Sequence, residues 1–330
     1  MDPRKIIKPF SGLLSLPASI RYSGENLIFP FYHAVTNEVP AHLKHLYRVK
    51  TIEEFQKDLD FLTKYFNPLS PAVLLNGSGS ARISEPSFIL SFDDGLREVK
   101  EVIAPLLKER GLSAIFFLNN EFINNKDLFF RYKASILVEN LDLLKQGITR
   151  RAEIGALLKR KDPDIKWIIK KILSIGYANR DLLDSIAVIL GVSYSEYLEK
   201  NRPYLDDQEI RTLIEEGFFI GSHSTDHPYF IELENGQQLQ EITESMEGIE
   251  RMFKPGYGFF AFPFTDQGFD KVLLRHEQVK YDAIFGTSGI KKQTIENYYQ
   301  RIPMEKSGNV AEDVIKTEYI YFMIKRLFNR

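Results

Sequence analysis

The chain of 330 residues contains no cysteine, one tryptophan and six histidines. The absence of cysteine excludes disulfides and thiolate chemistry, and it leaves His, Asp and Glu as the side chains available to bind a transition metal. The formal net charge of −2 gives no electrostatic reason to expect a nucleic-acid partner. A hydrophobic fraction of 44% and a charged fraction of 27% are ordinary for a globular protein.

Long apolar runs are also missing. No window approaches the run of about 20 apolar residues that a membrane-spanning helix needs. Pro9, Ser11 and Gly12 interrupt the weak apolar patch near the amino terminus, which is not typical of a signal peptide. We therefore expect a cytoplasmic protein. The stretch 314–330 mixes apolar and basic residues, which predicts a terminal helix packed on the domain, with peripheral contact to a membrane as the alternative.

Short apolar runs alternate with helical patterns along most of the chain, which predicts an α/β fold with parallel strands. Thr51 and Glu54 form a capping-box pattern at one helix start, and Asp206 is the expected N-cap of a helix over 207–216. Repeated strand–helix units of this kind predict a distorted or incomplete (β/α) barrel, with its chemistry at the carboxyl ends of the strands. The expected strands are 27–33, 88–92, 114–118, 218–221, 259–264, 283–286 and 300–304.

Strand signals stop between residues 124 and 202. We interpret 124–202 as a helical insertion within a single domain, 1–330, because this segment contains no His and no tight acidic cluster. The insertion could cover the site, contact a carrier lipid or mediate dimers, and the sequence does not choose among these or predict the oligomeric state. Its helical patterns lie at 141–148, 151–161, 165–176, 180–191 and 193–201.

Two adjacent carboxylates, Asp93 and Asp94, follow an apolar strand and precede Gly95. Such a pair is costly to bury unless a cation or hydrogen bonds compensate the charge. Gly95 permits the backbone to bend there, so that both side chains can point at one site. The alternative interpretation is a helix N-cap, for which one Asp would suffice.

A second group, His223 and His227, follows another buried strand within the segment GSHSTDHP. On one helical turn this spacing of four would point both imidazoles in the same direction, as a shared metal requires. Together with the two carboxylates, these residues suit zinc or a similar divalent ion that keeps open positions for water and substrate. A spare carboxylate beside such an ion is typical of a general base.

The segments FDDG and HSTDH, each after a buried strand, closely resemble the motifs of the NodB-type polysaccharide deacetylases, carbohydrate esterase family 4. The resemblance covers the chain outside the helical insertion. It implies that Asp93 is the general base and that the metal ligands are Asp94, His223 and His227. It also implies that the backbone N–H of Phe264 donates to the oxyanion.

The third motif of the family departs from its usual form here. An Arg that normally supports the base is replaced by Ala261 in the segment Ala261-Phe262-Pro263-Phe264. Some other cation must then support Asp93, and we expect Arg301, on the last predicted strand, to do so.

The general acid is the second departure. The family usually has a late His in this role, but no His follows His276, which lies in a polar, helical stretch. Instead His33 ends the first predicted strand, which resembles a branch of the family with an N-terminal catalytic His. We predict His33 as the acid, and the alternative is a hydrogen-bonded His at a strand end. His42 and His45 lie in a polar loop, and we expect no role for them.

These residues predict a metal-dependent hydrolase that removes the N-acetyl group of an amino sugar, in a polysaccharide or a glycan precursor, and releases acetate. The missing Arg leaves open a non-catalytic metal- or glycan-binding relative of the same fold. A metal hydrolase of a non-sugar amide is a further alternative. A phosphoesterase would want more His or Asp ligands for a second metal.

Overall fold

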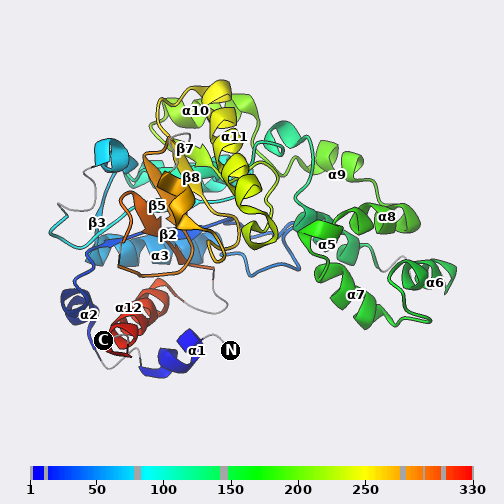
Figure 1. Cartoon of the computed structure of the whole chain (residues 1–330), viewed down its shortest axis with the longest axis horizontal. Coiled ribbons are helices and arrows are strands. Elements are labelled where there is room, and N and C mark those ends of the chain that lie inside the picture. The colour runs from blue at the N-terminus through cyan, green and yellow to red at the C-terminus, as the bar shows by residue number, and fades with distance from the viewer. Residues whose placement is uncertain are drawn as a thin grey trace.

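The computed structural model describes residues 3–10, 14–77, 83–141, 148–275, 280–292, 294–305 and 310–328. Its main sheet has eight strands in the order β10-β9-β8-β7-β6-β5-β2-β11, and every neighbouring pair is parallel (Figure 1). The strands are β2 (Pro30–Tyr32), β5 (Leu90–Phe92), β6 (Ala114–Leu118), β7 (Phe219–Ser222), β8 (Phe259–Ala261), β9 (Ala283–Gly286), β10 (Tyr298–Gln300) and β11 (Ile302–Pro303).

The last two strands nearly close the sheet. Arg301 alone separates β10 from β11, yet β10 pairs with β9 and β11 pairs with β2 at the opposite edge. The N–H of Arg301 donates to Gly286 over 3.1 Å, and the next N–H, of Ile302, donates to Phe29 over 2.8 Å. One kinked run therefore joins both edges, and the prediction of a distorted (β/α) barrel is confirmed. A small sheet of β1 (Leu27–Ile28), β4 (Ser87–Phe88) and β3 (Asn67–Pro68) accompanies it.

Helices cover the barrel and share its main apolar core. The predicted capping box at Thr51 and the predicted N-cap Asp206 are both present, and Asp206 also forms a capping box. Thr51 and Glu54 start α3, and Asp206 and Glu209 start α10. The helices concerned are α3 (Ile52–Tyr65), α4 (Ala104–Glu109), α10 (Asp207–Glu215), α11 (Asn235–Phe253) and α12 (Ala311–Phe328).

The two chain ends lie together (Figure 1). The predicted terminal helix is α12, which packs against α1 (Pro3–Ile7) and α2 (Leu16–Ser23). Within the ranges that the structure describes, no helix is long and apolar enough to cross a membrane.

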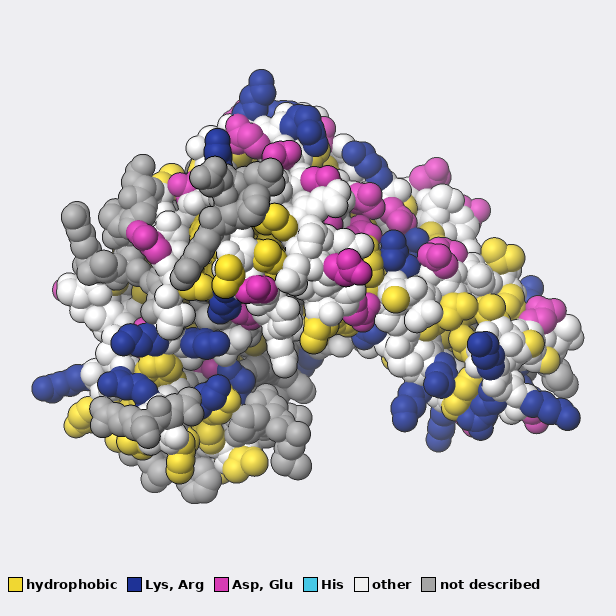
Figure 2. Space-filling model, viewed as in Figure 1, with side chains coloured by type: hydrophobic (Ala, Val, Ile, Leu, Met, Phe, Trp, Pro, Cys, Tyr) yellow, Lys and Arg dark blue, Asp and Glu magenta, His cyan; other side chains and the backbone are white. Residues whose placement is uncertain are grey.

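The range between β6 and β7 is helical and projects to one side of the barrel (Figure 1). Its helices share an apolar core that is separate from the main barrel core. Its outer end, formed by α6 and α7, carries a dense group of basic side chains (Figure 2). The predicted pattern at 141–148 lies largely outside the described residues, and the single-domain interpretation stays a prediction. The helices are α5 (Phe130–Glu139), α6 (Ile148–Leu157), α7 (Ile165–Leu173), α8 (Asp181–Leu190) and α9 (Tyr194–Asn201).

Candidate active site

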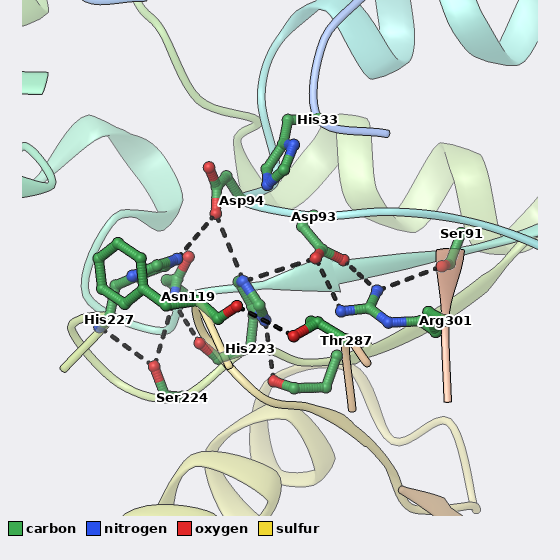
Figure 3. Close-up of polar contacts among 12 residues, drawn as sticks. His33, Ser91, Asp93, Asp94, Asn119, His223, Ser224, His227, Thr287 and Arg301 are labelled. Carbon is green, nitrogen blue, oxygen red and sulfur yellow. Dashed lines mark hydrogen bonds and ion pairs between the residues drawn. The ribbon is translucent and has the colours of Figure 1, made fainter. Parts of the chain in front are cut away.

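The predicted site residues gather at one rim of the barrel, because the carboxyl ends of parallel strands meet there. His33 follows β2, the two carboxylates of Asp93 and Asp94 follow β5, and His223 follows β7. Figure 3 shows these side chains converging, with Arg301 approaching from the opposite side of Asp93.

Asp94, His223 and His227 form a candidate metal centre. The Oδ1 atom of Asp94 lies 3.5 Å from Nε2 of His223 and 3.3 Å from Nε2 of His227. The ligand atoms of the three residues lie within 4.8 Å of one another, and all three side chains are buried. The Nδ1–H of His223 donates to the Ala261 carbonyl over 2.8 Å, so that its Nε2 lone pair faces Asp94.

The hydrogen bonding around Asp94 fits a cation. Its Oδ1 atom has no hydrogen-bond partner among the residues that the structure describes, although it is buried. A buried carboxylate oxygen that faces two imidazole lone pairs is costly unless a positive charge compensates it. One carboxylate and two imidazoles are a donor set that zinc accepts with positions to spare. The residues present therefore fit a divalent cation.

Four residues around this centre adopt left-handed backbone conformations: Asp94 (φ 72°), Ser224 (φ 73°), His227 (φ 64°) and Phe264 (φ 52°). Residues other than glycine that adopt such conformations cluster at functional sites, because the surrounding structure must hold them there.

The histidine pair lies on a loop, so the expectation of a helical turn is wrong. After β7 the backbone turns at Ser224, whose Oγ accepts the N–H of His227 over 3.1 Å. The amide of Asn119, at the end of β6, donates to the His223 carbonyl. The loop, rather than helical periodicity, brings the two imidazoles together.

Asp93 is paired with Arg301. The guanidinium donates to both carboxylate oxygens over 2.6 and 2.8 Å and also to Ser91 over 3.2 Å. Arg301 is fully buried, and its guanidinium lies 4.3 Å from the ring centre of Phe31. Burial by itself would raise the pKa of Asp93, but the charge and hydrogen bonds of Arg301, together with the charges of His223 and His33, lower it. The residue expected to replace the missing Arg therefore lies against the carboxylate it was expected to support.

His33 is paired with Glu305, which follows β11. Its Nδ1 bonds one carboxylate oxygen of Glu305, and the other oxygen accepts the backbone N–H groups of His33 (2.9 Å) and Ala34 (3.1 Å). Burial would lower the pKa of His33, but Glu305 outweighs it and, with smaller contributions from Asp94 and Asp93, raises it to about 9. The ring lies beside these two carboxylates (Figure 3).

Phe264 follows the end of β8, and the predicted strand 259–264 stops at Ala261. Its backbone N–H donates to no acceptor among the described residues, whereas its carbonyl accepts the Thr287 hydroxyl over 3.0 Å. Its ring stands perpendicular to that of His227, with centres 4.5 Å apart, and stacks on Tyr229. The N–H that the resemblance assigns to the oxyanion is thus unused within this structure.

The insertion contributes residues that the sequence analysis missed. The hydroxyl of Tyr132, on α5, donates to Oδ2 of Asp94 over 2.6 Å, and the ring of Phe129 lies 4.1 Å from that of His227. The hydroxyl of Tyr204 in turn accepts the N–H of Phe129 over 3.0 Å. The apolar spacing of Phe130, Ala134 and Leu137 was a signal for α5, but no pattern links its tyrosine to Asp94.

Glu305 was also missed, although its position after the last predicted strand, at the same rim, was a usable signal.

The two histidines for which no role was expected differ from each other. His42 does not lie in an exposed polar loop, because it is buried and its Nδ1 bonds the Tyr197 hydroxyl over 2.9 Å. Burial lowers its pKa to about 3, and it is therefore neutral. His45 is partly exposed and pairs with Glu139. His276 lies outside the described residues.

The fold and this rim define a barrel protein with a candidate centre for a single metal ion. The sequence model of the family "Polysaccharide deacetylase" matches residues 81–162 and 164–284. The chain therefore belongs to the polysaccharide deacetylase family, and the resemblance inferred from the motifs is confirmed. Family membership indicates a deacetylase among the hydrolases. A comparison with curated proteins finds no match.

Solved structures share the fold at low sequence identity. The deacetylase PplD of Streptococcus pyogenes in complex with acetate is 13% identical, with a TM-score of 0.55 over 88% of this chain and 97% of that one. IcaB from Ammonifex degensii is 14% identical, with a TM-score of 0.53 over 89% and 98%. A de-N-acetylase from Aggregatibacter actinomycetemcomitans is 15% identical, with a TM-score of 0.52 over 86% and 97%.

Proposed function

We propose that the protein hydrolyses the N-acetyl group of an amino sugar in a polysaccharide or glycan precursor, and that it uses a divalent cation, zinc by expectation. The observation that carries the proposal is the convergence of Asp94, His223 and His227 beside a second carboxylate, Asp93, that is not part of the triad. Family membership supports the acetylated substrate, and a cytoplasmic location stays a prediction.

Asp94 and the two histidines would hold the cation through Oδ1 and the two Nε2 atoms. When bound, such an ion polarises the acetyl carbonyl and lowers the pKa of a water molecule toward about 7.

Asp93 takes the proton of the attacking water as general base. It is suited to this role because Arg301 keeps it ionised while each of its oxygens retains a lone pair beyond those used by the guanidinium. The bidentate pair supports a catalytic role over a non-catalytic relative, since a guanidinium contacts Asp93 despite Ala261.

Stabilisation of the oxyanion is assigned to Phe264, and protonation of the leaving amine is assigned to His33. The unused N–H of Phe264 donates a hydrogen bond to the oxyanion as negative charge develops there. His33, held protonated at neutral pH by Glu305, gives a proton to the departing amine. Acetate and a free amino sugar result. This assignment follows the branch of the family with an N-terminal catalytic His.

Acetate release is the direct test. N-acetylglucosamine oligomers and nucleotide-linked N-acetyl sugars are incubated with the protein, with and without a chelator, and zinc is then restored. We expect release that the chelator abolishes and zinc restores. Bound zinc without acetate release across this panel would overturn the proposal in favour of a binding protein. Release from simple anilide amides but from no sugar would favour a non-sugar amide.

A further inference from the structure

A group of Lys and Arg side chains lies at the outer end of the helical insertion. It is well separated in sequence from the motifs at 93–94 and 223–227. Residues 149–173, which include most of α6 and all of α7, contain eight Lys or Arg but three Asp or Glu, in a chain whose net charge is −2. We call this segment the basic tip, and Figure 2 shows its dark side chains gathered at the lower right. The cations are Arg150, Arg151, Lys159, Arg160, Lys161, Lys166, Lys170 and Lys171.

Most of these cations have no acidic partner among the residues that the structure describes. In the described chain, the ion pairs of the basic tip are the long contacts Arg151–Asp162 (3.5 Å) and Arg160–Asp164 (3.9 Å). Lys166 and Lys170 stand four residues apart on α7, and both are exposed. Like charges at this spacing lie on one face and destabilise a helix, so intramolecular stability does not explain them.

Apolar side chains accompany the charges. Trp167, the single tryptophan of the chain, is partly exposed on α7, and the guanidinium of Arg160 lies 4.8 Å from its ring centre. Ile169 is also partly exposed, whereas Ile168 and Ile172 are buried and anchor α7 on the insertion core. Trp167 also packs against the insertion core. Lysines with a partly exposed, amphipathic tryptophan on an anchored helix are typical of a helix at a lipid–water interface.

A second lobe has the same chemistry. The helices at the two chain ends expose Tyr22 (67%), Leu327 (72%) and Phe328 (84%) beside Lys325 and Arg21. In Figure 2 this terminal lobe and the basic tip both project toward the lower edge, with a recess between them. An extended flat surface can contact both projections together, whereas a short soluble anion cannot.

We propose that the protein docks on a lipid bilayer that contains anionic phospholipids, with the basic tip as the main contact and the terminal lobe as the second. Acidic headgroups attract unpaired lysines near a membrane surface. A soluble polyanion would satisfy the charges but leaves the exposed aromatic and aliphatic side chains of both lobes without an explanation. This inference is independent of the proposed deacetylation.

Trp167 makes the test direct, because it is the single tryptophan and lies in the basic tip. Its fluorescence is titrated with phosphatidylcholine vesicles, with and without phosphatidylglycerol, and bound protein is measured by co-sedimentation. We expect a blue shift and sedimentation with the anionic vesicles alone. The double variant K166E/K170E should bind about tenfold or more weakly, since each lysine near the surface contributes appreciably to attraction.

The matched control is K64E/K200E, which makes the same change in charge at exposed lysines on α3 and α9. It should bind as the unmodified protein does, and both variants should keep the circular dichroism of the parent. No binding to anionic vesicles, equal binding to neutral ones, or equal weakening in both variants would overturn the proposal. So would binding to soluble polyphosphate as tight as to vesicles, which would indicate a soluble polyanion.

Discussion

The barrel rim and the helical insertion both contact Asp94, but through different atoms and different kinds of structure. The barrel loop presents two imidazoles to Oδ1, whereas α5 of the insertion donates one hydroxyl to Oδ2. Left-handed backbone conformations at several residues shape the rim, whereas the insertion reaches Asp94 through the Tyr132 side chain. The difference indicates that, in the proposed mechanism, the barrel supplies the reacting groups and the insertion orients Asp94. Changes at the rim should therefore abolish function, and changes in the insertion should reduce it.

The largest expected effect separates the two carboxylate roles within the rim. Asp93→Asn should lower kcat by about a thousandfold or more, because a general base is lost, while zinc stays bound. His223→Ala should lose both zinc and activity, because one of three ligands is missing. Acetate release and the zinc content of the purified variants measure the two effects. Equal loss of zinc from both variants would contradict the assignment.

Substitutions of Arg301 test how much the buried ion pair at the rim contributes to the stability of the fold. Arg301→Met leaves Asp93 buried without a partner, and the free energy of unfolding should fall by about 3–5 kcal/mol in urea titrations. Arg301→Lys, which keeps the charge, should lose less. Exposed ion pairs contribute under about 1 kcal/mol. A loss of that size for the methionine variant would show that Arg301 and Asp93 do not form a buried pair.

The insertion is tested at Tyr132. Tyr132→Phe removes the hydrogen bond to Asp94 and should weaken zinc affinity by about 10–100-fold, measured by competition with a chelating dye. Tyr197→Phe is the control, since it removes a hydroxyl of the same insertion that bonds His42 instead. If both variants bind zinc equally well, the insertion does not orient the ligand, and the comparison with the barrel fails.

The smallest effect concerns pH. His33 has a pKa of about 9, above its usual 6.5, so activity that needs the protonated form should fall as pH rises through about 9. The protonated His33 also stabilises the folded state. This stabilisation is fully present below about pH 6.5 and is lost as the pH rises to about 9. Glu305→Gln leaves burial dominant and should move the alkaline limb of the kcat profile to lower pH. Glu139→Gln, beside His45, should leave that limb unchanged.

Sequence patterns predicted the parts of this molecule that depend on local chemistry. The capping box at Thr51 was predictable because both partners lie within one helical turn, and Asp206 was predicted as an N-cap. The buried strand 114–118 was predictable because its apolar run is unbroken. The acids after β5 and the histidines after β7 were predictable because parallel strands deliver their ends to one rim.

Contacts between distant segments were not predictable in the same way. Tyr132 carries no sequence signal for Asp94, and the loop at Ser224 depends on left-handed conformations that L-residues rarely adopt. His42 was expected in a polar loop, but packing against Tyr132 and Tyr197 buries it. Arg301 was inferred from the missing family Arg and from its place on the last predicted strand, whereas its pairing geometry depends on the kink between β10 and β11.

The kink between β10 and β11 also determines when Asp93 and Arg301 can meet during folding. Asp93 and Arg301 are 208 positions apart, and the same residue that carries the guanidinium joins the two sheet edges. Contacts of such long sequence separation form late and slowly in folding. A chain whose final strands have not yet docked therefore lacks the Arg301 guanidinium beside Asp93. If Asp93 is the general base proposed above, activity should therefore appear only after the last strands have joined the two sheet edges.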